Sequence, residues 1–539
     1  MESKKFDVIV IGGGPNGLTA GCYLAKAGQK VLIVDRRSEI GGGCAMEQSY
    51  VKHFWHNTHA IYFPMVDCAP AYKDLQLDQY PYNLKHIYPP HQFAMLFKDG
   101  RSISLYSDVE KSVNSISRFS QKDAKNYKDL YIEAKTLFEE FIAPATYIPP
   151  YPTLDALMSM SRTEVGRKVQ VWGEQSPVTF VNEHFENDKV KALMMHTICM
   201  WGLDPEAAGL GFLIPLYINR STNYRLAVNT SHSLTQALIK HLYANGGKIL
   251  APKIIKRIIV EGGIAKGIEF SNGVIVEAEK AVLSTLDTHQ TFLDLVGEDK
   301  LSKDFVQGVK GWQWEHWSFF TVHIDLEAAP QFIVPDVDSA LIYIMGCESA
   351  EDVVEHYRII GQGEVGKESG FTCSFPTLHD PTQAPPGKHT GLISKMVPYR
   401  LKEGKDQWYS FKFKQEQAMA CMELLRRYAP NLTDDNIRAF FVNTPLDTEN
   451  RFSNMVEGSI KQGAYTLLQM GYNRPNPECS QHRSPIKNLY MGGACTYPGG
   501  TVLMAIGYLA ANAVADDFGI KKWWPEPEMV TKARQKGIL

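Results

Sequence analysis

The sequence lacks the features that mark several specialised classes of protein. Its 539 residues include nine cysteines, an odd number without a CxxC pair, so we expect reduced thiols rather than a disulfide framework or a zinc site. The formal net charge is only −3, which gives no electrostatic reason to expect nucleic acid as a partner. The longest late apolar run, Val502 to Ala515, ends at two aspartates and is too short to predict a membrane span.

The first residues also lack a signal-peptide pattern, because the apolar run in MESKKFDVIVIGGG is short and ends in glycines. We therefore expect a soluble, cytoplasmic protein. Internal repeats and low-complexity segments are missing as well. With 44% hydrophobic and 21% charged residues, the composition is that of an ordinary globular protein. The length predicts about three to four domain-sized units.

The N-terminal residues have the pattern of a dinucleotide-binding unit. Two short runs rich in β-branched residues, at 6–11 and 31–34, predict buried parallel strands. Between them, residues 18–27 read as a helix that ends before a glycine. A strand–helix–strand order of this kind is typical of proteins that bind a nucleotide at the turn between the first strand and the helix.

Glycines occupy that turn at a characteristic spacing. In Gly12-x-Gly14-x-x-Gly17, the first glycine permits the tight turn, the second lets the backbone approach a pyrophosphate, and the third allows close packing of helix and strand. We expect Pro15 and Asn16 at the same site, where the helix N-terminus presents free N–H groups to the phosphates.

An acidic residue and a second glycine cluster extend the pattern. Asp35 ends the second strand, 18 residues after Gly17, where its carboxylate can accept hydrogen bonds from a ribose and disfavours the 2′-phosphate of NADP. Arg36 follows, and Gly41-Gly42-Gly43 then lets another backbone segment approach the phosphates. Simple NAD-binding units lack this extension, so the predicted cofactor is FAD.

Together with later motifs, this unit resembles the phytoene-desaturase-like branch of the FAD-dependent amine oxidase superfamily. Within that branch it is most similar to the pyridine nucleotide-disulfide oxidoreductase domain-containing flavoproteins. The resemblance covers most of the chain and is patchy in the middle. The later motifs are Ile255–Gly267, Ser284–Leu293, Thr444-Pro445-Leu446-Asp447, Arg474-Pro475, Ser484–Tyr490 and Gly492-Gly493-Ala494-x-x-x-Pro498-Gly499-Gly500.

The resemblance implies an α/β fold: a Rossmann-like FAD-binding domain built from discontinuous segments, with an inserted α+β substrate domain of mixed sheet plus helices. We expect 1–75, 230–300 and 471–539 to form the FAD-binding domain. We expect 76–229 and 301–470 to form the substrate-binding domain. Nucleotide-type patterns at the start, near 250–290 and at the end agree with this division.

The same resemblance assigns further cofactor contacts. Ile255 would contact the adenine through its backbone. A helix that starts near Thr501 would point its N-terminus at the flavin ring and place positive potential there. The residues expected beside the flavin are Gly493, Ala494, Gly500, Thr501 and Val502. The chain departs from the family in this segment, because the glycine run after Pro498 is cut short.

Two residues are catalytic candidates. His59 belongs to a stretch that passes near the flavin in the resembling family, and a histidine titrates near neutrality. The alternative is a hydrogen-bonded structural histidine. Tyr497 precedes the Pro-Gly-Gly turn and is either a residue that acts as a base or polarises a carbonyl, or a packed aromatic. Metal binding is not expected, because no carboxylate or cysteine completes a ligand spacing.

The resemblance implies an oxidoreductase that removes a hydride and a proton from a CH–CH unit, with FAD as the hydride acceptor. The expected substrate is apolar or ring-shaped, such as a cyclic ketone or a polyene. Alternatives are a flavin amine oxidase, a non-catalytic flavin-holding protein and a redox-neutral isomerase. The electron acceptor is open between oxygen and a quinone. Trp523 and Trp524 lie beside lysines, which fits either peripheral membrane contact or a docked end.

Overall fold

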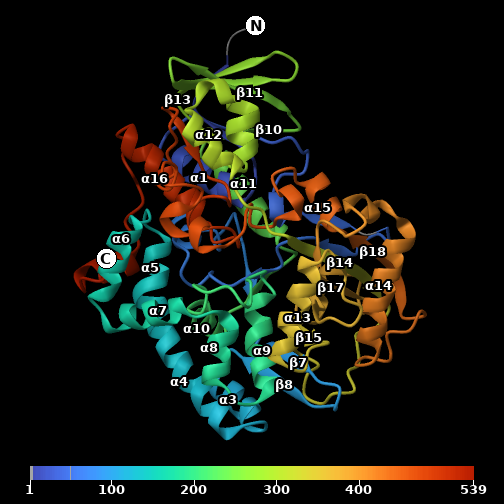
Figure 1. Cartoon of the computed structure of the whole chain (residues 1–539). Helices are drawn as coiled ribbons and strands as arrows, with labels where there is room; N and C mark the ends of the chain where they lie inside the picture. The colour runs from blue at the N-terminus through green and yellow to red at the C-terminus, as the bar shows by residue number, and fades with distance from the viewer. Residues whose placement is uncertain (1–3, 49) are drawn as a thin grey trace.

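The computed structural model describes residues 4–48 and 50–539. Within these residues, two sheets of seven strands each organise the molecule. In Figure 1 the first sheet lies at the top near the N-terminus, and the second lies at the lower right beside a layer of helices. Side chains from both sheets and their helices form several buried hydrophobic clusters.

The first sheet has a parallel centre. Its order is β10 (Lys248–Leu250), β2 (Val31–Val34), β1 (Lys4–Ile11), β13 (Ile275–Ser284), β12 (Ile264–Phe270) and β11 (Ile255–Glu261), with β19 (Leu489–Met491) added beside β13. β1 pairs in parallel with β2 and β13, whereas β11, β12 and β13 are antiparallel. Every residue of β2 is buried, as expected for a strand covered on both faces.

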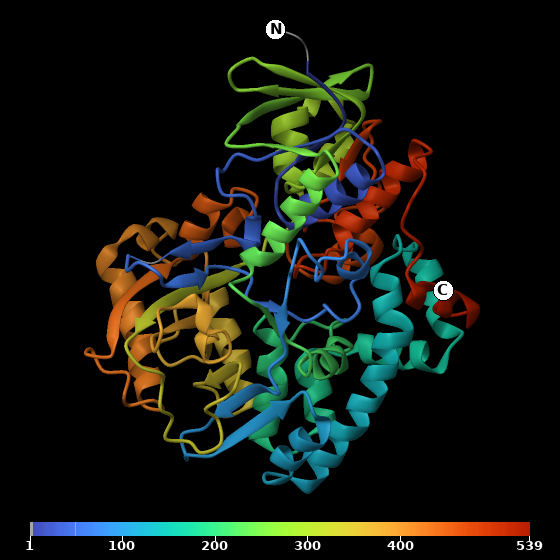
Figure 2. The same cartoon turned by 180° about the vertical axis from the view of Figure 1, so that it is seen from behind.

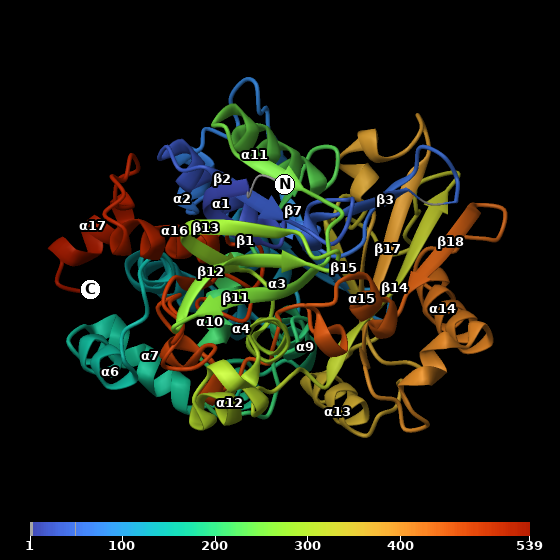
Figure 3. The ribbon, with the colours of Figure 1, turned by 90° about the horizontal axis from the view of Figure 1, so that it is seen from above.

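Three helices from distant parts of the chain cover this sheet. They are α1 (Pro15–Lys26), α11 (His232–Ala244) and α16 (Ala505–Asp517). α1 packs against both of the others, and Figure 3 shows α1 beside β1 with α16 next to it. The predicted strand–helix–strand unit is therefore confirmed. The helix begins at Pro15, a residue suited to a first helical turn, rather than at residue 18.

The second sheet combines early and late segments. Its order is β18 (Ile437–Asn443), β14 (Trp317–Leu326), β17 (His389–Pro398), β16 (Phe371–Ser374), β15 (Ile342–Met345), β7 (His91–Leu96) and β8 (Ser102–Tyr106). Figure 2 shows the blue strands β7 and β8 at the lower edge, beside the yellow strands. The contact between β15 and β7 is parallel, and it joins residues about 250 positions apart in the sequence.

The remaining elements surround these sheets. The main helices are α3 (Val109–Ser117), α4 (Gln121–Leu137), α7 (Glu164–Glu174), α8 (Pro177–His184), α9 (Asp188–Cys199), α10 (Leu213–Arg220), α12 (Lys303–Lys310), α13 (Ala350–Gly361) and α14 (Phe411–Arg426). The short elements are α2 (Pro70–Asp74), α5 (Ala143–Thr146), α6 (Thr153–Ser161), α15 (Pro445–Arg451), α17 (Glu528–Gln535), β3 (Met46–Gln48), β4 (Trp55–Asn57), β5 (Tyr62–Phe63), β6 (His86–Ile87) and β9 (Arg225–Ala227). Among the described residues, no helix combines the length and the apolar character that a bilayer crossing requires.

The expected start of the last large helix is wrong. α16 begins at Ala505 rather than near Thr501, because three residues before it have left-handed backbone angles. The φ angles are +102° at Thr501, +55° at Val502 and +54° at Met504. A chain with these angles cannot follow a right-handed helix, so the segment forms an irregular turn instead.

The domain boundaries stay a prediction. The strands of the first sheet come from 4–34, 248–284 and 489–491, and those of the second come from 91–106 and 317–443. Trp312 and Trp314 precede β14 and pack on the hydrophobic cluster beside the first sheet.

Candidate functional site

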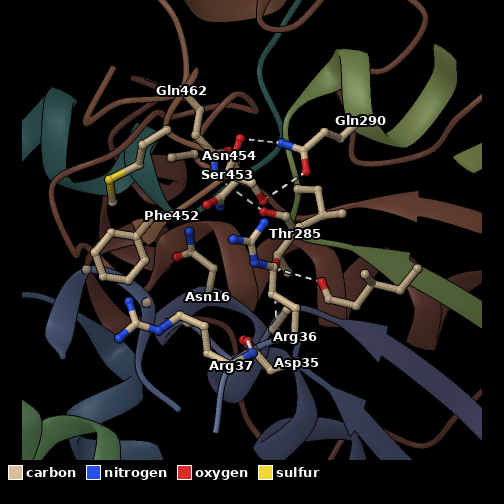
Figure 4. Close-up of a pocket in the computed structure, with 18 of the residues that line it drawn as sticks. Asn16, Asp35, Arg36, Arg37, Thr285, Gln290, Phe452, Ser453, Asn454 and Gln462 are labelled. Carbon is tan, nitrogen blue, oxygen red and sulfur yellow. Dashed lines mark hydrogen bonds between the residues drawn. The ribbon is translucent and has the colours of Figure 1, made fainter. Parts of the chain in front are cut away.

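A cavity of about 320 Å³ lies at the C-terminal ends of β1 and β2. In sheets of this type, nucleotides bind outside the carboxyl ends of the parallel strands. Figure 4 shows Asp35, Arg36 and Arg37 at one end of the cavity, with Gln290 and Gln462 at the opposite end. The cavity therefore lies where the glycine pattern predicts a nucleotide site.

Most of the predicted cofactor residues line this cavity. They are Gly12, Gly14, Pro15, Asn16, Asp35, Arg36, Gly42, Gly43, Ile255, Ala494, Gly500, Thr501 and Val502. Gly17, Gly41 and Gly493 lie behind the lining, where added side chains would collide with neighbouring atoms. The tertiary structure thus brings segments from the two ends and the middle of the chain to one cavity. Their individual contacts with a cofactor stay predictions.

The first glycines are needed for two different reasons. Gly12 has a φ angle of +100°, and a Cβ there would lie 2.2 Å from the Thr285 hydroxyl oxygen. A Cβ on Gly17 would lie 2.1 Å from the Gly12 carbonyl oxygen, so only glycine lets α1 pack this closely on the turn. These two positions serve the protein itself.

Gly14 and Gly42 have a different role, since they face each other across the cavity. A Cβ on Gly42 would lie 3.1 Å from the Gly14 Cα atom. A Cβ on Gly14 would meet the Gly42 Cα atom at 3.8 Å and nothing closer. The two bare backbone segments form a cradle that a side chain would fill, and a pyrophosphate fits such a cradle at the N-terminus of α1.

Asp35 shapes the turn between these segments. One carboxylate oxygen accepts a hydrogen bond from the Gly13 backbone N–H at 2.8 Å, and the other accepts one from the Arg37 N–H at 2.8 Å. The side chain also lines the cavity, where a ribose hydroxyl would find a charged acceptor. The predicted position of Asp35 is therefore correct, and its carboxylate has a second function in holding the loop.

Arg37 is a site residue that sequence reasoning missed. Its guanidinium lies 4.7 Å from the ring centre of Phe452 and 3.1 Å from the Glu39 carboxylate. The Nη1 atom is buried, yet among the described residues it has no hydrogen-bond partner. A buried cationic donor without a partner at a cavity wall is suited to an anionic or oxygen-rich ligand. Its place directly after Arg36 was the available signal.

The segment from Phe452 to Met455 is also missing from the predicted site, although it lines the cavity. It follows α15, whose start is capped twice: the Thr444 hydroxyl accepts from the Asp447 N–H at 3.1 Å, and the Asp447 carboxylate accepts from the Thr444 N–H at 3.0 Å. This capping box orients the helix that ends at Arg451. The family motif at 444–447 therefore positions a cavity wall.

His59 lies behind Phe452 rather than among the cavity-lining residues. The two rings meet edge to face with centres 4.5 Å apart. Burial, aided by the nearby Arg451 and Arg37 charges, lowers the pKa of His59 to about 3. The imidazole is therefore neutral at physiological pH. Its Nε2 atom has no hydrogen-bond partner among the described residues.

Tyr497 also lies outside the lining. Its hydroxyl donates a hydrogen bond to the Ala145 carbonyl oxygen at 2.7 Å, and burial raises the pKa of the phenol. This contact favours the interpretation of a packed aromatic. The catalytic roles of His59 and Tyr497 stay predictions.

Comparison with known proteins extends the argument to the whole chain. The sequence profile of the NAD(P)-binding Rossmann-like domain matches residues 10–75. A limonene dehydrogenase chain of Castellaniella defragrans, named as one of that enzyme's subunits, is 37% identical, and the match covers 100% of both chains. Pyridine nucleotide-disulfide oxidoreductase domain-containing protein 2 of Mus musculus is 25% identical over 95% of this chain and 94% of its own. Phytoene desaturase of Phycomyces blakesleeanus is 22% identical over 98% of this chain and 88% of its own.

Solved structures share the fold at lower identity. An oxidoreductase from Methanosarcina mazei aligns with a TM-score of 0.59 at 17% identity, covering 95% of this chain and 100% of that one. Cyclohexylamine oxidase from Brevibacterium oxydans aligns with a TM-score of 0.59 at 15% identity, covering 95% and 99%.

The cradle of Gly14 and Gly42, the free donor of Arg37 and the end-to-end sequence matches all fit the same cofactor. The chain belongs to the phytoene-desaturase-like branch of the FAD-dependent amine oxidase superfamily, and it is an FAD-dependent oxidoreductase of the dehydrogenase and desaturase type.

Proposed function

We propose that this protein dehydrogenates a small, apolar, ring-shaped hydrocarbon or a related cyclic ketone. The observation that carries the proposal is the match to limonene dehydrogenase over the full length of both chains. The more distant match to phytoene desaturase, named for a polyene, supports the same reaction type on another apolar molecule. In that reaction a C–H bond loses a hydride and the neighbouring carbon loses a proton, so that a C=C bond forms.

FAD, when bound, supplies the hydride acceptor. The protein's own residues hold and orient it. Gly14 and Gly42 leave room for the pyrophosphate, and the N–H groups at the start of α1 point toward it. Asp35 would accept hydrogen bonds from the ribose. At the other end of the cavity, the turn of Gly500, Thr501 and Val502 would flank the ring.

The side chains at the end of the chain favour docking over membrane contact. Trp523 stacks on Tyr23 with ring centres 5.5 Å apart, and its indole N–H donates to the Tyr23 carbonyl oxygen at 3.0 Å. Trp524 is buried and donates to the Asn512 side chain at 3.1 Å. We therefore propose that this tail closes the cofactor half of the molecule rather than entering a lipid surface.

We also propose a reducing, cytoplasmic setting and an assembly with a different chain. All nine cysteines are free thiols, and eight of them are buried. The limonene dehydrogenase relative is named as one subunit of its enzyme, which supports such an assembly. The electrons would leave to a quinone or to oxygen.

Anaerobic mixing of the FAD-loaded protein with candidate substrates tests the reaction. Limonene or a cyclic ketone should bleach the flavin absorbance, and the recovered product should be two mass units lighter, or should carry an added oxygen where water captures the oxidised carbon. Cyclohexylamine is the matched amine. If it alone bleaches the flavin, the protein is an amine oxidase. If only dithionite does so, the binding-protein hypothesis replaces this one, and an unchanged product mass would indicate an isomerase.

A further inference from the structure

A completely buried arginine lies beside the cofactor cavity. Arg474 is 0% exposed, and among the described residues no carboxylate forms an ion pair with it. Its three guanidinium nitrogens instead donate only to backbone carbonyl oxygens. The acceptors are Lys461 at 2.8 Å, Ala494 at 3.0 and 3.3 Å, Gln469 at 3.1 Å, Gly463 at 3.3 Å and Ala464 at 3.3 Å.

Two aromatic rings complete the surroundings of this guanidinium. Its central carbon lies 4.8 Å from the ring centre of Tyr465 and 5.3 Å from that of Trp312. Taking a guanidinium out of water is costly unless its donors are satisfied and its charge is stabilised. Carbonyl oxygens and aromatic faces meet both needs here without a neutralising anion.

The accepting carbonyls belong to two chain segments that form one wall of the cavity. Ala494 lines the cavity directly, and Gln462 lies within the loop that supplies the other acceptors. The Gln462 side chain joins the same segments, because its Oε1 atom accepts from the Cys495 N–H at 3.1 Å. The indole N–H of Trp312 donates to the Gln462 carbonyl oxygen at 3.1 Å. Arg474 thus connects a loop and a turn that are about 30 residues apart.

The nearest buried carboxylate already has a partner. Glu315 and Lys461 are each 2% exposed, and the Lys461 ammonium lies 3.2 Å from the Glu315 carboxylate. The Lys461 ammonium also donates to the Trp201 carbonyl oxygen at 2.6 Å. The Ser459 hydroxyl donates to the other carboxylate oxygen of Glu315. The charge of Arg474 is therefore not spent in an ion pair.

We propose that Arg474 is a positioning residue for the flavin, one that fixes the cavity wall of Gln462 and Ala494 and supplies positive charge favouring the reduced cofactor. This inference rests on the assignment of FAD to the cavity and deepens the proposed function. The wall role follows from the carbonyl contacts. The electrostatic role follows because a cation in a low-dielectric interior stabilises a nearby anion more strongly than it would in water.

Two variants of the full-length holoenzyme separate these roles. Arg474→Gln keeps polar donors but removes the charge, whereas Arg474→Lys keeps the charge but loses the planar fork. We expect both to raise the FAD dissociation constant, by roughly tenfold for Gln and about threefold for Lys. Only Arg474→Gln should move the midpoint potential of the bound flavin to a more negative value. Dissociation is measured by flavin fluorescence, and the potential by reduction against a reference dye.

Arg483→Gln is the matched control, because Arg483 is a partly exposed arginine nearby that pairs with Asp517 at 2.7 Å. It should change neither quantity. If Arg474→Gln lowers the melting temperature yet leaves FAD affinity and potential at wild-type values, Arg474 only supports the fold and the proposal is wrong. If Arg474→Gln does not fold, Arg474→Lys decides, since unchanged FAD affinity in that variant also contradicts the proposal.

Neither readout involves a substrate. An incorrect substrate assignment therefore leaves these expectations intact, and an incorrect role for Arg474 leaves the substrate assignment intact. Trp312→Phe adds a smaller perturbation of the same wall, because it removes the indole N–H donor and keeps an aromatic ring on the guanidinium. We expect about a twofold loss of FAD affinity with an unchanged potential. A shift in potential equal to that of Arg474→Gln would contradict the electrostatic part.

Discussion

The two walls of the cofactor cavity are built in different ways. The wall from residues 12–43 consists of bare backbone, and its shape depends on glycines close together in the sequence. The wall from 451–502 depends on side chains that bind the carbonyls and amides of distant segments. Backbone walls admit a ligand closely but accept almost no added atom. Side-chain walls allow graded changes, because one donor can be weakened while the others remain.

The largest expected effect comes from Gly17→Val on the backbone wall. The new Cβ would lie 2.1 Å from the Gly12 carbonyl oxygen, so α1 could not pack on the turn. We expect a loss of about 4 kcal/mol or more in the free energy of unfolding, and little soluble protein. Gly308→Val in α12 is the control, since a Cβ there meets nothing within 4 Å. Wild-type stability of Gly17→Val would contradict the packing role.

Gly14→Val should leave the fold and remove the cofactor. Its Cβ meets only the Gly42 Cα atom, at 3.8 Å, so the side chain would occupy the cradle rather than the protein core. We expect a folded, colourless protein, measured as the ratio of flavin to protein absorbance alongside circular dichroism. Gly173→Val, another glycine with open surroundings, should stay yellow. A yellow Gly14→Val protein with full FAD content would show that the pyrophosphate binds elsewhere.

Arg37→Gln tests a side chain that bridges the two walls. The buried Nη1 donor and the contact with Phe452 would both be lost. We expect FAD to bind roughly tenfold more weakly, about 1.4 kcal/mol, with the melting temperature of the cofactor-free protein nearly unchanged. Isothermal titration with FAD measures the affinity. Equal affinity in the variant and the wild type would mean that the free donor faces solvent rather than the cofactor.

His59 should contribute to acid sensitivity. Because its pKa in the folded state is about 3, below the unfolded value of about 6.5, the stability that it contributes is present above pH 6.5 and is lost as the pH falls toward 3. Between pH 6.5 and 4.5, the unfolding free energy of His59→Gln should fall less steeply, by up to about 1.4 kcal/mol per pH unit. Urea titrations at several pH values measure this slope. Parallel slopes for both proteins would contradict the burial of a neutral imidazole.

Tyr497→Phe should have the smallest effect. It removes one hydrogen bond to the Ala145 carbonyl, so we expect a stability loss of about 1 kcal/mol and an unchanged rate of flavin reduction. Stopped-flow reduction by substrate measures that rate. A drop of about a hundredfold or more would restore Tyr497 as a catalytic residue and would show that the hydroxyl turns toward the cavity when substrate binds.

The two walls also differ in how well the sequence predicts them. The turn at 12–17, the acidic residue at 35 and the glycines at 41–43 act through local backbone geometry, so spacing alone located them. Phe452, Gln462 and Arg37 could not be found in this way, because their roles depend on which distant segment they meet. The helix predicted from Thr501 failed for a related reason: apolar composition favours a helix, but the left-handed angles of Thr501, Val502 and Met504 belong to a turn set by packing.

By itself the sequence determined a dinucleotide-type unit at the N-terminus, the FAD preference and the family resemblance, since glycine and carboxylate spacing constrains a short stretch of backbone directly. Only the tertiary structure decided that the opposite wall comes from residues 451–502, that Arg474 is buried against carbonyls, and that His59 and Tyr497 lie behind the cavity lining. Those outcomes depend on long-range packing, in which each side chain's neighbours are set by the whole fold rather than by adjacent residues.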